Sequence, residues 1–224
     1  GVTTTAFPCA TLLACTWNTG IVREIGAAGA REVHENGIGV WLTPAINIHR
    51  SPLCGRNFEY YSEDPLVAGE MAAAMVEGIQ SEGVGASLKH FACNNKETNR
   101  KDSDSRVSER ALREIYLKGF EICVKKAQPL TVMSSYNLLN GLWASQNREL
   151  LTDILRGEWG FEGMVTTDWY THAPQYTEIA AGNDVKMGCG DPAHTLKMMR
   201  EGKLSREDVK TSVKRLLEMI LKLA

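Results

Sequence analysis

The stretch Gly163–Tyr170, GMVTTDWY, predicts a short buried strand that ends on a carboxylate followed by an indole. In a barrel of parallel strands, the side chains at the C-terminal end of each strand point into the mouth where chemistry takes place. Asp168 would deliver a carboxylate to that mouth, and Trp169 would place a flat apolar face with one polar handle beside it. A carboxylate next to an aromatic wall suits attack on a sugar. An acid directly after a strand also often caps the next helix, so the rest of the chain must decide between the two roles.

Segments on both sides of this stretch alternate between strand and helix patterns. Strands are predicted at 39–48, 84–90, 130–136 and 163–168, with a further short strand within 180–187. The predicted helices are one that starts after Thr16 or Asn18 and ends near 36, then 64–83, one from 108, 148–159, 192–201 and one from 205. Strand followed by helix, repeated along the chain, predicts a parallel sheet with helices outside it.

The number of predicted strands limits how complete a barrel the chain can form. About five strands are predicted, whereas a closed (β/α)8 barrel has eight. We therefore expect an α/β fold in which residues 1–224 form a single, partial TIM-like barrel domain. In its last helix, apolar side chains recur at helical spacing and are expected to face the core. They are Val209, Val213, Leu216, Leu217 and Ile220.

Composition excludes several classes of function. The 224 residues are 43% hydrophobic, and 25 basic residues against 27 acidic ones give a net charge of −2. No charged block indicates nucleic acid or an anionic membrane as partner, and no apolar run approaches the roughly 18 residues of a membrane span. The six cysteines form no Cys-x-x-Cys pair and lie in apolar segments, as reduced, buried thiols do. Together with the lack of a signal-peptide pattern, they predict a cytoplasmic protein.

Polar side chains occur at the predicted strand ends or in the loops that follow them. Arg56 lies in the polar and aromatic loop after the first strand, Lys89 and His90 end the second, Tyr136 ends the third, and Asp168 ends the fourth. Each alone has an ordinary explanation, such as a solvated lysine or a structural histidine. The carboxyl ends of parallel strands meet at one edge, however, so cations and hydrogen-bonding groups would gather opposite one acid.

These residues lie in motifs that resemble the N-terminal barrel domain of glycoside hydrolase family 3, in its β-glucosidase branch. The resemblance covers essentially the whole chain and thins between 170 and 187. Its motifs follow the family order: Asn47–Arg50 through Gly55–Glu59 to Glu63–Pro65, then Lys89–Phe91, Ser135–Asn137 and Thr167–Trp169, with Leu151–Arg156 and Trp159–Phe161 between the last two.

The resemblance implies a retaining exo-β-glycosidase that cleaves a terminal β-D-glucosyl unit. It carries the role of nucleophile onto Asp168 and that of holding sugar hydroxyls onto Arg56, Lys89 and His90. Tyr136 and Trp169 match residues that line the same subsite. A retaining enzyme attacks with one carboxylate and uses a second carboxyl, about 5 to 5.5 Å away, as acid and then base. Nearby cations would keep the attacking carboxylate ionised, and no metal or other cofactor is required.

Two departures from the family pattern bear on partners. The family's barrel begins upstream of Gly1, with an Asp-Gly-Pro motif whose Asp binds the sugar, and its acid/base Glu lies in a following α/β sandwich domain. We therefore expect the acid/base to come from outside this chain. Because an exposed sheet edge favours association, we also expect the chain to work with those missing pieces or to associate with itself or a partner.

One feature of the loop after Lys89 and His90 bears on the substrate. The family branch that acts on N-acetylglucosamine keeps an Asp-His pair in this loop. Here the loop has Asp102 and Asp104 but no His, which favours glucosidase-like specificity.

Two alternatives from other classes remain open. A non-catalytic sugar-binding or structural module derived from the same barrel would keep the binding residues and show no turnover. A metal hydrolase on a similar barrel would use His90 and Asp168 as ligands. Turnover of an aryl β-glucoside would distinguish the glycosidase from the non-catalytic module. Loss of activity in the presence of a chelator would indicate the metal hydrolase.

Overall fold

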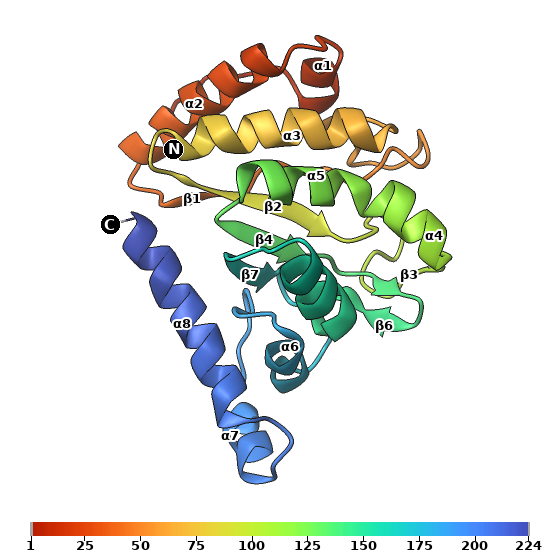
Figure 1. Cartoon of the computed structure of the whole chain (residues 1–224), viewed down its shortest axis with the longest axis vertical. Coiled ribbons are helices and arrows are strands. Elements are labelled where there is room, and N and C mark those ends of the chain that lie inside the picture. The colour runs from red at the N-terminus through yellow and green to blue at the C-terminus, as the bar shows by residue number, and fades with distance from the viewer. Residues whose placement is uncertain (1, 224) are drawn as a thin grey trace.

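The centre of the computed structural model, which describes residues 2–223, is a sheet of four parallel strands (Figure 1). In spatial order they are β1 (Val40–Trp41), β2 (Gly85–Phe91), β4 (Thr131–Ser134) and β7 (Met164–Thr167). Parallel strands require crossover connections, and helices supply them here. The fold class predicted from the sequence, a parallel sheet with outer helices, is confirmed.

The helices begin where the sequence places capping residues. Asn18, rather than Thr16, caps the first long helix and accepts a hydrogen bond from the Ile21 N–H at 3.1 Å. Asp64 does the same for the Leu66 N–H at 2.7 Å. The α-helices are α1 (Ala10–Ala14), α2 (Thr19–Glu35), α3 (Pro65–Gln80), α4 (Glu109–Ala111), α5 (Lys118–Ala127), α6 (Gln175–Ala181), α7 (Pro192–Arg200) and α8 (Arg206–Leu223). Short 3-10 turns form η1 (Asn57–Glu59) and η3 (Ala144–Gln146), and π-helical segments form η2 (Leu112–Tyr116) and η4 (Glu149–Glu158).

Helices α2, α3 and α5 are layered against one side of the sheet (Figure 1). The crossing of α2 and α3 depends on glycine, because a Cβ atom on Gly78 would lie 2.1 Å from the carbonyl oxygen of Arg23. Any larger residue there would push the two helices apart. The backbones of α2 and α3 therefore lie close together at this point.

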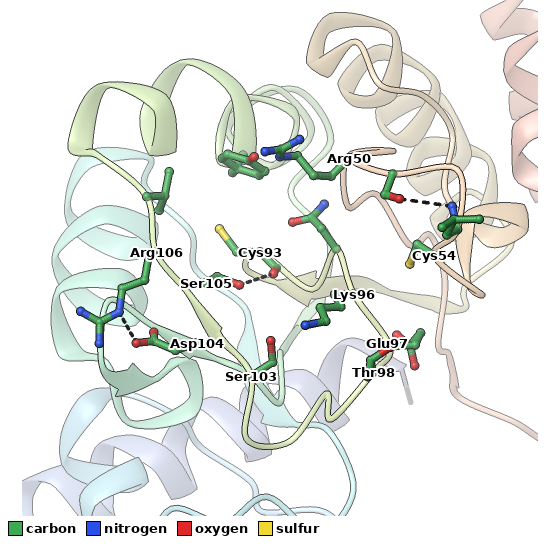
Figure 2. Close-up of a pocket in the computed structure, with 15 residues that line it drawn as sticks. Arg50, Cys54, Cys93, Lys96, Glu97, Thr98, Ser103, Asp104, Ser105 and Arg106 are labelled. Atoms are coloured by element: carbon green, nitrogen blue, oxygen red, sulfur yellow. Dashed lines mark hydrogen bonds and ion pairs between the residues drawn. The ribbon is translucent and has the colours of Figure 1, made fainter.

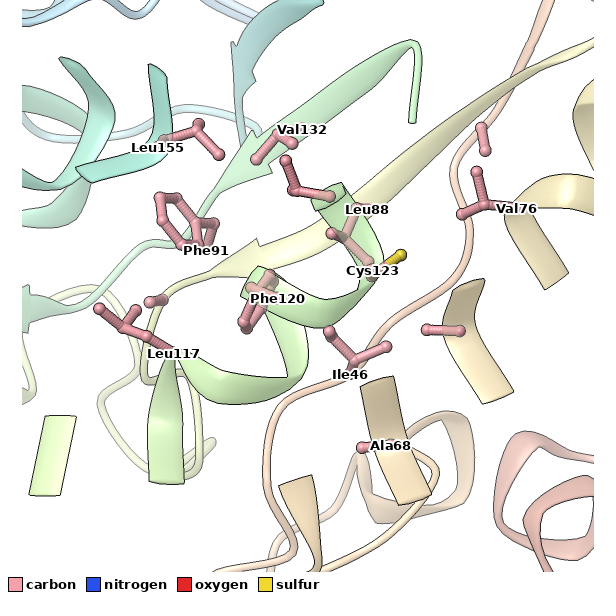
Figure 3. Close-up of a cluster of buried hydrophobic side chains, with 14 of the residues drawn as sticks. Ile46, Ala68, Val76, Leu88, Phe91, Leu117, Phe120, Cys123, Val132 and Leu155 are labelled. Atoms are coloured by element: carbon pink, nitrogen blue, oxygen red, sulfur yellow. The ribbon is translucent and has the colours of Figure 1, made fainter. Parts of the chain in front are cut away.

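The hydrophobic core fills the space between the sheet and these helices (Figure 3). The Phe91 ring lies at its middle, 5.1 Å from the Phe120 ring and 5.8 Å from the Trp159 ring between centroids. Leu88 and Val132 reach into the same cluster from neighbouring strands. The strands that end at the polar residues are therefore anchored by buried side chains along their length.

A second, smaller sheet joins two loops at the carboxyl edge of the main sheet. Its strands are β3 (Asp104–Ser105), β5 (Leu138–Leu139) and β6 (Leu142–Trp143). The β5–β6 hairpin turns at Asn140 and Gly141, whose φ angles are 50° and 91°. Positive φ at both central residues is the condition for the tight turn that Asn-Gly favours. This sheet ties the loop after β2 to the loop after β4.

The predicted strand at 39–48 is shorter than expected. Only Val40–Trp41 forms a regular strand, and the chain then passes through Pro44, which has no N–H to donate to a ladder. Pairing with β2 nevertheless continues, since the carbonyls of Thr43 and Pro44 each accept an N–H of β2 at 3.0 Å and the Ile46 N–H donates to the Lys89 carbonyl at 2.8 Å. The segment therefore stays beside β2, although its regular strand geometry ends at Trp41.

The predicted strand within 180–187 is also partly wrong. Its first residues belong to α6, which ends at Gly182 with a φ of 99°. The chain then runs extended, and the Thr167 N–H donates to the Val185 carbonyl at 2.9 Å. A fifth extended segment thus lies parallel to β7, but it begins after Gly182 and not at residue 180.

The inward orientation predicted for α8 is wrong. Val213 and Leu217 are 49% and 53% exposed, Ile220 is also exposed, and Val209 and Leu216 are half-buried. The inner side of the helix carries Ser212, which is buried, and Arg215, which reaches the buried carboxylate of Asp184 at 3.0 Å. This ion pair fixes the rotation of α8 and turns its apolar stripe outward.

The cysteines and the helices bear on two further expectations. All six cysteines are free thiols, but only Cys93 and Cys123 are buried, so the expectation that all six are buried is wrong. Among residues 2–223, no helix combines the length and the apolar character that crossing a bilayer requires.

Candidate active site

Asp168 follows β7 directly and lies at the carboxyl edge of the main sheet. Its N–H donates to the Ser134 carbonyl of β4 at 3.2 Å, which extends the ladder by one residue and fixes the backbone. One carboxylate oxygen accepts the Trp169 N–H at 2.8 Å. The residue is only 7% exposed. The carboxylate is thus held in place and largely shielded from water.

His90 faces this carboxylate from the end of β2, with its Nε2 atom 3.8 Å from Oδ2 of Asp168. Its backbone is clamped by Asn47, whose side chain both accepts from the His90 N–H and donates to the His90 carbonyl at 2.9 Å. Burial lowers the pKa of His90 well below its usual value, and the positive charges of Arg56, Lys89 and Arg100 lower it further. The imidazole is therefore neutral at pH 7, and it is free to exchange hydrogen bonds with hydroxyl groups.

Arg56 and Lys89 meet through a residue to which the sequence analysis gave no role. Glu59 binds the Arg56 Nε with one carboxylate oxygen and lies 3.5 Å from the Lys89 Nζ with the other. Burial lowers the pKa of Lys89, whereas the negative charges of Glu59 and Asp168 oppose that shift. Lys89 therefore interacts electrostatically with the carboxylates of both Glu59 and Asp168. Glu59 lies within a quoted motif, but nothing in the sequence indicated that it bridges two segments.

Tyr136 lies between Asp168 and the loop after β2. Burial raises its pKa to about 12, and the neighbouring charge of Asp168 acts in the same direction. The phenol thus keeps its proton and can donate it in a hydrogen bond. The Arg100 guanidinium lies 4.8 Å from the centre of the ring, and the Lys101 ammonium 5.1 Å, so two cations stack on its face. The contacts of Arg100 and Lys101 with this ring were not predicted from the sequence.

Trp169 and Tyr170 form an aromatic wall beside the carboxylate. Trp169 is half-buried and Tyr170 is exposed. Both rings rest on Gly188, where a Cβ atom would lie 2.9 Å from Trp169 Cδ1 and 3.0 Å from Tyr170 Cζ. The wall therefore depends on a glycine in the extended segment that follows α6.

The loop after β2 is also joined to the loop after β7. His172 Nδ1 lies 3.1 Å from the Asp102 carboxylate, and the Lys101 ammonium donates to the Tyr170 carbonyl at 3.2 Å. The loop that carries Asp102 has no histidine of its own. The fold brings His172 to it from another loop, 70 residues away in the chain. No local sequence signal could have indicated this pair.

All six predicted site residues therefore belong to the carboxyl side of the sheet. His90 and Lys89 come from β2, Tyr136 from the segment after β4, and Asp168 from the end of β7. Arg56 reaches them through Glu59. Among residues 2–223, no group of three or more His, Cys, Asp or Glu side chains is arranged to hold a metal ion. The pair of His90 and Asp168 alone falls short of the ligand number that protein metal sites need.

A separate cavity of about 590 Å³ lies between the segment with Arg50 and Cys54 and the loop from Lys96 to Arg106 (Figure 2). None of the six predicted site residues lines it. The Cys93 thiol at its wall is buried, and burial raises its pKa to about 12, so the thiol is not a reactive thiolate. The cavity is therefore separate from the group of residues around Asp168.

Comparison with known proteins decides the family. The model of the glycosyl hydrolase family 3 N terminal domain matches residues 1–219. The chain belongs to glycosyl hydrolase family 3. The resemblance drawn from its motifs is thereby confirmed over nearly its whole length.

Relatives within family 3 are similar in sequence and in structure. The chain is 60% identical to β-glucosidase A of Butyrivibrio fibrisolvens over 93% of its own length and 25% of that protein. It is 44% identical to an exo-α-(1→6)-L-arabinopyranosidase of Bifidobacterium breve over 99% of its length and 29% of that protein. The structure of β-glucosidase 3B from Thermotoga neapolitana in complex with α-D-glucose superposes with a TM-score of 0.95 at 51% identity, covering 97% of this chain and 32% of that one. The chain thus spans about a quarter to a third of the length of these family 3 proteins.

Proposed function

We propose that the chain forms the nucleophile-bearing part of a retaining exo-β-glycosidase that releases terminal, non-reducing β-D-glucosyl residues. One observation carries the proposal: a shielded carboxylate at a strand end, Asp168, faces a neutral histidine and acts electrostatically on Lys89, while Arg56 lies close enough to lower the pKa of that histidine. The names of the family 3 relatives support the substrate class.

In this proposal Asp168 is the nucleophile. Its carboxylate attacks the anomeric carbon, the bond to the leaving-group oxygen breaks, and a glycosyl ester forms that water later hydrolyses. The Trp169 N–H fixes the carboxylate, so little reorganisation is needed for attack. Because His90 is neutral, it does not neutralise the attacking charge as an imidazolium would.

The remaining residues hold the sugar in the same proposal. Lys89, His90 and Arg56 donate hydrogen bonds to its hydroxyl groups, and these bonds keep the ring in place as it distorts toward an oxocarbenium-like state. Tyr136 and Trp169 line the subsite, Tyr136 with a protonated phenol and Trp169 with an aromatic face. A sugar ring has hydroxyl groups around its edge and apolar C–H groups on its faces. The hydrogen-bond donors would bind the hydroxyl groups, and the aromatic ring of Trp169 would pack against an apolar face.

The second carboxyl group is proposed to come from outside residues 1–224. Glu59 is the acid closest to the cations, but both of its oxygens are already engaged by Arg56 and Lys89. That engagement leaves it unsuited to pass a proton to a leaving group. If the nucleophile is Asp168 and the acid/base comes from elsewhere, a further segment of a longer polypeptide, or another chain, must lie at the carboxyl face of the sheet.

Partner requirements follow from the same proposal. We treat residues 1–224 as one barrel domain that works with further segments or with a second copy of itself. In support, the chain matches only 25% to 32% of the relatives' lengths, and within residues 2–223 β1 has β2 as its one strand neighbour. Neither nucleic acid nor a membrane is proposed as partner, and the cytoplasmic location remains a prediction from the cysteines.

The decisive test traps the glycosyl ester. A dinitrophenyl 2-deoxy-2-fluoro-β-D-glucoside needs no proton donor to lose its leaving group, so it tests Asp168 without the second carboxyl. We expect the chain to gain the mass of one fluoroglucosyl unit, located by peptide mapping on Asp168. Asp168→Asn should slow labelling by more than roughly 1,000-fold, while Asp153→Asn, an exposed aspartate on η4, should label like the wild type.

The outcomes separate the alternatives. Labelling that persists in Asp168→Asn would contradict the nucleophile assignment. Binding of glucose without any labelling would favour the non-catalytic sugar-binding module. Labelling with the corresponding α-L-arabinopyranosyl reagent in preference to the glucosyl one would move the substrate class toward that of the Bifidobacterium breve relative.

A further inference from the structure

Glu59 links two segments that are 30 residues apart in the chain. It ends η1, which follows Arg56 in the loop after β1, and its second oxygen faces Lys89 of β2. The side chains are only partly accessible, with Lys89 15% and Glu59 21% exposed. Partial burial makes this contact stronger than an ordinary surface ion pair.

Charges around the candidate site would be unbalanced without this carboxylate. Lys89 and Arg56 carry two positive charges, and His90 is neutral. The nearest other carboxylates are Asp168, whose charge already acts on Lys89, and Glu97, which pairs with Arg100 at 3.1 Å. If Glu59 did not hold them, the two cations would be drawn toward Asp168.

We propose that Glu59 is a positioning residue, which holds Arg56 and Lys89 in the orientation that binds the sugar and keeps them from pairing with Asp168. This inference rests on the proposed function. A nucleophile that pairs directly with a lysine is a poorer attacking group, and the same movement would bring the lysine into the space of the sugar ring. Glu59 thus separates the cations that recognise the substrate from the carboxylate that reacts with it.

Three variants test this role in the full chain. Glu59→Gln keeps the shape but loses the charge, and its amide NH2 repels one of the two cations. Glu59→Asp keeps the charge on a shorter side chain. Glu63→Gln is the matched control, because Glu63 lies in the same loop, is exposed, and forms no ion pair with any of residues 2–223. Thermal melting of each variant reports on folding.

Two measurements are made on each variant: glucose affinity by calorimetry and the rate of labelling by the fluoroglucoside at saturation. We expect Glu59→Gln to weaken glucose binding and to slow labelling, each by roughly 10- to 100-fold, because a displacement of about 1 Å in a positioning group costs that much. Glu59→Asp should recover part of both, and Glu63→Gln should match the wild type. A purely structural residue would lower the melting temperature and leave both values unchanged in the folded fraction.

The possible outcomes distinguish this inference from the proposed function. If the wild type binds and labels, and Glu59→Gln does so equally well, the positioning role is wrong while the proposed function stands. If Glu59→Gln fails and Glu59→Asp fails equally, with both folded, the charge is not what matters and the inference is overturned. If the wild type neither binds glucose nor labels, the proposed function falls, and Glu59 is left as a structural ion pair.

Discussion

At the scale of single residues, the burial of His90 makes the stability of the fold depend on pH. It is 1% exposed, and its pKa is lowered because both desolvation and three neighbouring cations oppose a positive charge. In the unfolded chain the same histidine protonates freely below pH 6.5. The folded state therefore loses stability as the pH falls, since the unfolded state binds a proton that the folded state does not.

A pH series of unfolding experiments checks this effect. Below pH 6.5, His90 should contribute a loss of roughly 1 kcal/mol in the free energy of unfolding for each pH unit. His90→Gln should therefore lose less stability than the wild type between pH 7.5 and pH 5, measured by urea denaturation. His34→Gln, at an exposed position in the last turn of α2, serves as control. Parallel curves for His90→Gln and the wild type would contradict the prediction.

At the same scale, the sequence could predict which residues gather but not what holds them. Lys89 and His90 lie near the end of β2, and Tyr136 and Asp168 follow β4 and β7, so the geometry of a parallel sheet is enough to bring them together. Glu59 and the pair of Asp102 and His172 depend on how loops fold back, which no periodic pattern encodes. The cations on the Tyr136 ring were missed for the same reason.

At the scale of elements, a buried ion pair fixes the loop that follows β7. Lys186 binds the Glu178 carboxylate of α6 at 2.9 Å and donates to the carbonyls of Thr171 and Ala173 at 3.1 and 2.8 Å. Ser145 and Thr171 donate to the other oxygen of Glu178 at 2.8 and 2.7 Å. Every charge in this network is paired and hydrogen-bonded, as a buried ion pair requires.

Removing the cation should therefore be costly. Lys186→Met leaves the Glu178 carboxylate buried without its counter-charge, and we expect a loss of about 3 kcal/mol or more in the free energy of unfolding. The double variant with Glu178→Gln should recover part of that loss. Lys197→Met, on the exposed side of α7, should change stability little. A loss below about 1 kcal/mol for Lys186→Met would show that water reaches the site.

Elements also explain where the sequence analysis went wrong. Helical spacing in α8 indicated correctly that one side is apolar, but spacing cannot tell which side faces the protein. The buried Asp184 decides this, because it binds both Arg156 and Arg215 and so orients the helix by charge. Similarly, β1 ends at Trp41 although the following residues are strand-like, because the Thr43 N–H turns back to the Trp41 carbonyl at 2.8 Å instead of pairing with β2.

At the scale of the whole molecule, the apolar stripe of α8 is exposed to solvent. With residues of α7 it forms an open groove, and apolar grooves of this kind favour association in water. Its apolar lining residues are Leu196, Met199, Val209, Val213, Leu217 and Leu221.

Sedimentation measures the consequence. We expect the chain to sediment as species heavier than its 24.7 kDa monomer, increasingly so with concentration. Val213→Glu combined with Leu217→Glu should shift it toward the monomer, while Leu66→Glu, on an exposed position of α3, should not. A wild-type chain that stays monomeric at every concentration would contradict the prediction.

The hairpin turn at Asn140 and Gly141 separates, along the chain, the proposed sugar-binding residues from the proposed nucleophile. Residues before it carry Arg56, Lys89, His90 and Tyr136, and residues after it carry Asp168. A cut in this turn would leave substrate capture on one fragment and the reacting oxygen on the other. Under the proposed function, neither fragment could do the chemistry alone, and activity on an activated glucoside would report that the two had reassembled.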